Sequence, residues 1–216
     1  MVNNPCYPSY AIRDLYMHDG FDYVILVEDN LARLLVRHCI DKEKLSRSKL
    51  INIIPVGGWR NVLNLQNELF QSSSFGVGTK IFCVLDGDIK NDAVKSEKYQ
   101  GYPKLFLPVS SVEKLLRDTV ILDNEDNSDK LLPLRKELKD IFFIRRSLNE
   151  ILADYHQDNK KNHTHDADGK KLYRAMIEEL TQLNISEETF IERLAGLIEN
   201  YFSFIKFEEQ LRKMLS

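Results

Sequence analysis

The amino-acid sequence predicts an α/β protein in which a Rossmann-like parallel sheet of four strands is flanked by helices and followed by a helical appendage. Two patterns lead to this prediction. In the first half, short runs of β-branched and aromatic residues alternate with stretches of helical periodicity, as in a doubly wound sheet. After about residue 122 the strand signals fade, and helical periodicity continues to the end. The composition, with 43% hydrophobic residues among 216, is that of an ordinary globular chain.

Four segments are expected to form the strands. Tyr23–Val27 is a continuous apolar run, which is typical of a strand that is buried on both faces. The other three strands are expected at 50–54, 80–85 and 104–107. The helices of this part are expected at 10–17, 30–39, 59–70 and, after a serine cap, 111–117.

We divide the chain into a leading segment over 1–22, an α/β core over 23–122 and a helical appendage over 123–216. The acid-rich stretch 123–129 is expected to be a surface loop. Helices are expected beyond it at 130–140, 145–155, 170–183, 187–201 and 204–215. Several aromatic residues of the appendage are expected to lie in its core or at an interface with another copy of the chain: Phe190, Tyr201, Phe202, Phe204 and Phe207.

Acidic residues collect at the ends of the expected strands. Glu28 and Asp29 follow the first strand, Asp86 and Asp88 follow the third, and Glu113 comes soon after the fourth. Ligands of open parallel sheets bind at the carboxyl ends of the strands, so these side chains mark the expected site. A carboxylate set without His or Cys suits Mg²⁺ or Mn²⁺. Such an ion can orient a phosphate and activate a water molecule.

The ordered set of motifs resembles the TOPRIM domain, which occurs in topoisomerases, primases and the OLD (overcoming lysogenization defect) family of nucleases. That domain has a strand ending in Glu, a Gly-containing turn after the second strand and Asp-x-Asp after the third. Here Glu28, the Gly57–Gly58 pair and the Asp86–Asp88 segment stand at these places. The resemblance covers about residues 23–113.

The resemblance implies a metal-dependent DNA endonuclease. Within the family, Glu28 would be a metal ligand or general base, and Asp86 and Asp88 would hold Mg²⁺ or Mn²⁺. Glu113 would serve a second metal position. The chain is most similar to the OLD branch, whose members usually carry an ABC-like ATPase, and this implies a possible role in anti-phage defence.

Two further segments, 107–114 and 168–173, are also similar to OLD-type nucleases. The second of them implies that Lys170 or Lys171 stabilises the charge of the scissile phosphate. Two positions depart from the family pattern, because Asp29 stands where many members have Gly and Ala32 stands where OLD-type enzymes often have an acid. Asp29 could replace that missing ligand.

The expected partners are DNA and an ATPase. The chain contains no Walker P-loop, so the ATPase would be another domain or a separate protein. Gly57, Gly58 and Arg60 are the expected DNA contacts, and Trp59 could pack beside them or stack on a base. The segments 33–60 and 130–146 carry local charges of +5 and +4, which could follow a phosphate backbone despite the net charge of −3.

Two other functions fit parts of the pattern. The segment 25–30 resembles the start of a response-regulator receiver, in which Asp86 would accept a phosphoryl group. However, the residues after Asp86 lack the Met-Pro and Asp-Gly pairs of receivers. The second alternative is a TOPRIM-like module that binds or assembles without catalysing a reaction.

The remaining signals concern compartment and metal. Cys6, Cys39 and Cys83 are widely spaced and odd in number, which favours reduced thiols in the cytoplasm. No apolar run approaches the ~18–20 residues that a membrane span needs, and no signal peptide is present, so no membrane partner is expected. The two histidines of 163–166 are interpreted as surface residues rather than as metal ligands.

Overall fold

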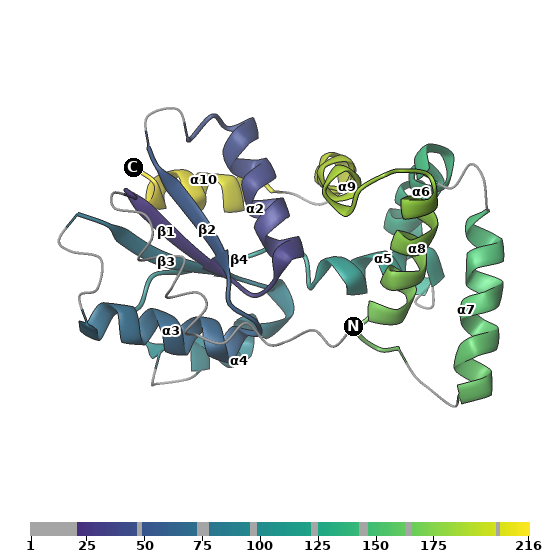
Figure 1. Ribbon diagram of the computed structural model, residues 1–216, viewed down its shortest axis with the longest axis horizontal. Helices are drawn as coiled ribbons and strands as arrows, with labels where there is room; N and C mark the ends of the chain where they lie inside the picture. Colours follow the sequence, from purple (N-terminus) through teal and green to yellow (C-terminus); the bar gives the residue numbers. More distant parts are fainter. Residues whose placement is uncertain are drawn as a thin grey trace. The chain divides into compact units, whose positions relative to one another are not determined.

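The computed structural model describes residues 21–46, 49–72, 78–95, 99–121, 125–142, 147–162, 166–201 and 204–216 (Figure 1). The helix expected at 10–17 and the residues Cys6, His163, His165 and Phe202 lie outside these ranges. The chain forms two compact units. Unit 1 contains the residues up to Ser110 together with Phe204–Ser216, and unit 2 contains Ser111–Ser203.

Unit 1 is built on one sheet with the strand order β2-β1-β3-β4, and all of its pairings are parallel. The strands are β1 (Tyr23–Val27), β2 (Ile51–Pro55), β3 (Lys80–Leu85) and β4 (Lys104–Phe106). In the centre of the sheet, Ile25 is in register with Ile53 and Phe82. The predicted α/β class and the four-stranded parallel sheet are therefore confirmed.

Helices cover both faces of this sheet (Figure 1). One face carries α3 (Trp59–Ser72) and α4 (Lys90–Lys95), and the other carries α2 (Asn30–Lys42) and α10 (Ile205–Met214). Alternate residues of β1 serve the two faces, because Val24 and Leu26 pack in one cluster with α3, whereas the Tyr23 hydroxyl donates to the Ser216 carbonyl after α10 (3.1 Å). All five residues of β1 are buried for this reason, as the continuous apolar run predicts.

The last helix, α10, packs on unit 1. Phe207 and Leu211 are buried, and the Lys42 ammonium on α2 donates to the Glu208 carboxylate at 2.9 Å. The division of the chain thus differs from the predicted one. Unit 2 begins at Ser111 rather than at residue 123, and α10 belongs with the sheet rather than with the helical appendage.

Unit 2 consists of helices in its described residues. They are α5 (Val112–Ile121), α6 (Glu125–Phe142), α7 (Leu148–Asn162), α8 (Lys170–Gln182) and α9 (Glu187–Tyr201). α5 packs on α6 and α8, α6 packs on α9, and α7 packs on α8. Leu134, Met176 and Phe190 are completely buried among these helices, so Phe190 is a core residue.

Two local structures differ from the expected ones. Residues 125–129, expected to belong to an acidic surface loop, form the start of α6. Acidic residues are favourable there because the N-terminus of a helix carries a partial positive charge. After β3, the 3-10 turn η1 (Gly87–Ile89) and the short helix α4 occupy a stretch for which no helix is predicted.

Candidate functional site

Glu28 joins the loops that follow β1, β2 and β3. Its side-chain Oε1 accepts the backbone N–H of Asp86 at 3.0 Å. Its backbone carbonyl accepts the N–H of Gly57 at 2.8 Å. The predicted acid after the first strand is therefore tied to the predicted glycine turn and to the Asp86–Asp88 segment.

The Gly57–Gly58 turn begins α3. The two residues have φ values of 95° and 62°, in the left-handed region that favours glycine. The Gly58 carbonyl accepts the N–H groups of Asn61 and Val62 at 3.0 and 3.2 Å, which starts the helix. The turn thereby directs the N-terminus of α3 toward Glu28. The Trp59 N–H at this terminus acts to lower the pKa of Glu28.

The Asp86–Asp88 segment is held by the segment after β4. The Gly87 N–H lies 2.9 Å from the Val109 carbonyl oxygen and 3.0 Å from that of Ser110. A Cβ atom on Gly87 would lie only 2.5 Å from the Val109 carbonyl oxygen. This close approach explains why glycine stands between the two aspartates.

These contacts form a continuous series across the carboxyl edge of the sheet. Hydrogen bonds connect the loop after β2 to that after β1, the loop after β1 to that after β3, and the loop after β3 to that after β4. We call Glu28, Asp29, Asp86 and Asp88 the edge carboxylates. The structure brings their loops together as the parallel topology predicts.

Burial and neighbouring charges act on Glu28. Burial raises the pKa of Glu28, the Asp86 N–H opposes this rise, and the nearby charges of Asp29 and Asp88 add to it. Asp29 also has a structural role, because its Oδ1 accepts the Ala32 N–H at 2.8 Å and caps α2. Asp88 is exposed and lies in the first turn of η1.

Arg60 is exposed beside this edge. Its guanidinium lies over the ring of Trp59, with 5.1 Å between Cζ and the ring centroid. This cation–π contact presents a planar cation on an aromatic ring next to the Gly57–Gly58 turn. Such a pair can meet a phosphate or a base.

The other predicted site residues, Glu113, Lys170 and Lys171, belong to unit 2. The Lys170 ammonium lies 3.6 Å from the Asp168 carboxylate, and Lys171 lies 3.2 Å from that of Asp158. Within the unit, α8 begins against α5. A Cβ atom on the residue before it, Gly169, would lie 2.3 Å from the Glu113 carbonyl oxygen.

Asp166 has a structural role at this helix start. It is buried, and its carboxylate accepts the N–H groups of Lys171 and Leu172 and the Tyr155 hydroxyl, each at 3.1 Å. Burial acts to raise the pKa of Asp166, but these hydrogen bonds outweigh burial and lower it. The carboxylate is thus satisfied by the protein itself.

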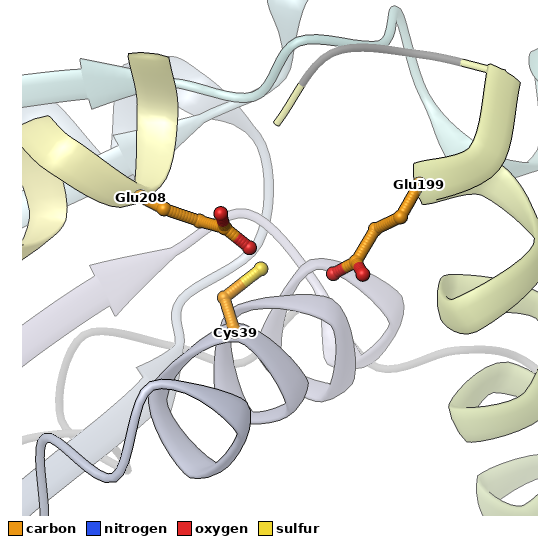
Figure 2. Close-up of side chains that lie close together, drawn as sticks. All are labelled: Cys39, Glu199 and Glu208. Carbon is orange, nitrogen blue, oxygen red and sulfur yellow. The ribbon is translucent and has the colours of Figure 1, made fainter. Parts of the chain in front are cut away.

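The structure also pairs two residues that sequence reasoning did not connect. The Cys39 thiol of α2 and the Glu208 carboxylate of α10, both in unit 1, face one another within 4.8 Å (Figure 2). Glu199, also drawn there, belongs to unit 2. The Cys39–Glu208 pair could not be predicted, since no spacing motif relates residues so far apart in the chain.

No model of a known protein family matches the chain, and no curated protein matches it either. Among the residues that the structure describes, no helix combines the length and the apolar character required to cross a membrane.

Proposed function

We propose that the chain is a Mg²⁺- or Mn²⁺-dependent DNA endonuclease domain of the TOPRIM type, with the ion held by Glu28, Asp86 and Asp88. The observation that carries this proposal is the hydrogen-bonded series along the carboxyl edge, in which Glu28 Oε1 accepts the Asp86 N–H. The series connects the loops that carry these acids, so the acids lie at one edge of the sheet. A metal centre requires ligands from separate loops to be supported at one place, and connected loops favour this.

The donor set fits a hard divalent cation. All four edge carboxylates offer oxygen, and the charges of Asp29 and Asp88 disfavour ionisation of Glu28, a repulsion that a cation would relieve. A carboxylate has several acceptor positions, so Glu28 can keep its bond to Asp86 and still bind an ion. A bound ion would polarise a phosphate oxygen and lower the pKa of a water molecule. Asp29 would contribute through the oxygen that does not cap α2.

DNA would approach the same edge. Arg60 would pair with a phosphate or stack on a base beside the Gly57–Gly58 turn. Glu113 at a second metal position and Lys170 or Lys171 at the scissile phosphate complete the proposal, on the basis of the family resemblance. We further propose a cytoplasmic protein that works with an ATPase domain or subunit and that could self-associate through its helices.

Metal binding can be tested with the only tryptophan of the chain, Trp59. Tb³⁺ binds oxygen-rich sites and emits when an excited tryptophan lies close by. We expect saturable Tb³⁺ emission that Mg²⁺ or Mn²⁺ competes away and that Asp86→Asn and Asp88→Asn weaken strongly. The exposed Asp41 on α2 provides a matched control, because Asp41→Asn makes the same change away from the edge.

Catalysis is tested by plasmid nicking with Mn²⁺. We expect the wild type and Asp41→Asn to nick and Asp86→Asn to be inactive. Equal activity of wild type and Asp86→Asn would overturn the metal assignment. A wild type that binds Tb³⁺ but leaves the plasmid intact, with and without candidate ATPases, would favour the non-catalytic module.

A further inference from the structure

The helices α6 and α7 of unit 2 border a groove of about 580 Å³. We call it the α6–α7 groove. Its apolar wall is formed by Leu132, Pro133 and Leu148, and its cationic rim by Arg135, Lys136 and Lys139. None of these residues belongs to the proposed metal centre, but the three cations lie in the segment 130–146, whose charge could also follow a phosphate backbone.

The apolar wall results from the way α6 is buried. Leu131, Leu134 and Leu138, at i, i+3 and i+7, are buried on one side of this helix. Leu132 lies on another side and is 55% exposed, whereas Leu148 at the start of α7 is only 1% exposed. The groove therefore combines a buried apolar floor with a leucine in contact with water. A ligand that covers this surface gains from the hydrophobic effect.

Among the described residues of the rim, every charged side chain is a cation. None of the described residues that line the groove is acidic. Arg135 is half-buried and lies 3.5 Å from the side-chain oxygen of Asn149, so α7 helps to orient its guanidinium. Lys136 and Lys139 are exposed. Such a rim complements an anionic group.

We propose that the α6–α7 groove binds a long-chain carboxylate. The hydrocarbon chain would lie against the exposed Leu132 and Pro133, and the carboxylate would meet Lys136 and Lys139. A volume of about 580 Å³ falls within the ~300–1,000 Å³ of small-molecule sites, which are mostly apolar and carry a few polar groups. A DNA backbone would satisfy the lysines, but its phosphates would find no partner on the apolar wall.

The probe for the test is dodecanoate, titrated below its micelle concentration into the full chain and followed by calorimetry. EDTA is present, so the outcome does not depend on the proposed metal centre. We expect saturable binding of one dodecanoate per chain. Lys136→Glu combined with Lys139→Glu should weaken it by about tenfold or more, because two attractive charges become repulsive. Leu132→Ser should weaken it by removing apolar contact.

The matched control is Lys160→Glu combined with Lys161→Glu. These exposed lysines lie at the end of α7 and do not line the groove, yet their reversal changes the net charge equally. This variant should bind like the wild type. Absence of saturable binding by the wild type, or an equal loss in the control, would overturn the proposal. So would a DNA duplex that displaces dodecanoate and binds Leu132→Ser as tightly as wild type. All variants change exposed side chains, and circular dichroism verifies that they fold.

Discussion

At the scale of single residues, Gly87 has no room for a side chain at the carboxyl edge of the sheet. A Cβ atom at this position would lie 2.5 Å from the Val109 carbonyl oxygen and 2.6 Å from that of Leu107. Both are backbone atoms, which cannot turn aside as a flexible side chain can. We expect Gly87→Ala to lower the free energy of unfolding by about 1–3 kcal/mol, the usual cost of overpacking. Urea denaturation measures this change.

The control for Gly87→Ala is Gly78→Ala, also in unit 1. A Cβ atom on Gly78 would meet no atom within 4 Å. That variant should stay within about 0.5 kcal/mol of the wild type, as surface substitutions usually do. If both variants were equally stable, β3 and the segment after β4 would not approach as closely as described.

Asp166 makes the stability of unit 2 depend on pH. Its pKa is lowered from the ordinary value of 3.8, so the folded protein binds this proton less readily than the unfolded chain. The stabilisation is therefore present above the unfolded pKa and is lost as the pH falls through the folded pKa. We expect Asp166→Asn to cost about 1–3 kcal/mol at neutral pH, because buried N–H groups lose a charged acceptor. The free energy of unfolding of Asp166→Asn should also fall less than that of the wild type when the pH is lowered.

Urea denaturation of Asp166→Asn at neutral and acidic pH, followed by circular dichroism, tests this expectation. The exposed Glu188 on α9 supplies the control, since Glu188→Gln also removes one negative charge from unit 2. That variant should keep the acid dependence of the wild type. An Asp166→Asn variant with an unchanged acid dependence would contradict the role of Asp166 as a charged acceptor.

At the scale of elements, the strands could be predicted because burial on both faces leaves a direct trace in the sequence. β1 is apolar at every position, since α3 covers one side and α2 and α10 the other. The sequence pattern does not predict the short helix α4. It has six residues and a single buried apolar residue among those described, Ala93, which is too little for a periodic signal.

The last helix was assigned to the appendage for a similar reason. Its apolar spacing predicts a helix, but spacing alone does not say which surface the helix covers. α10 buries Leu211 completely and leaves Ile205 65% exposed. We expect Leu211→Ala to destabilise unit 1 by about 2–5 kcal/mol, as a buried leucine truncation does.

Trp59 reports selectively on this effect, because it is the only tryptophan and lies on α3 of unit 1. Leu211→Ala should therefore move the urea transition of tryptophan fluorescence to lower concentration. Ile205→Ala, on the same helix, should leave the transition almost unchanged. A Leu211→Ala variant with a normal Trp59 transition would contradict the packing of α10 on the sheet unit.

At the scale of the whole molecule, the candidate site divides into a part that the sequence could predict and a part that it could not. The edge carboxylates share one edge of the sheet because parallel strands place their carboxyl ends together, and this follows from the order of strands. Glu113 and Lys170 lie in unit 2, and their contacts there depend on helix packing. Helical periodicity predicts which face is buried but not which helices meet, so the assignment of these residues depended on resemblance.

The edge carboxylates should also couple metal binding to the stability of the folded chain. The pKa of Glu28 is raised, first by burial and also by the charges of Asp29 and Asp88. The associated stabilisation is complete below the ordinary value of 4.5 and is lost as the pH rises through the folded pKa. An ionised Glu28 without metal therefore lacks this stabilisation. Glu28→Gln should raise the unfolding temperature in EDTA, since glutamine keeps an oxygen for the Asp86 N–H.

Mg²⁺ should reverse the order of the two unfolding temperatures, so that the wild type becomes more stable than Glu28→Gln. When the concentration of an ion is a hundred times its Kd, the free energy of unfolding rises by about 2.7 kcal/mol for a protein that binds the ion only when folded. The wild type should thus melt at a higher temperature with Mg²⁺, while Glu28→Gln should respond much less because it has lost a ligand. Glu68→Gln, an exposed change on α3, should behave like the wild type in both conditions. If Glu28→Gln were less stable than wild type in EDTA and equally stabilised by Mg²⁺, Glu28 would be a structural acceptor and the ion would bind elsewhere.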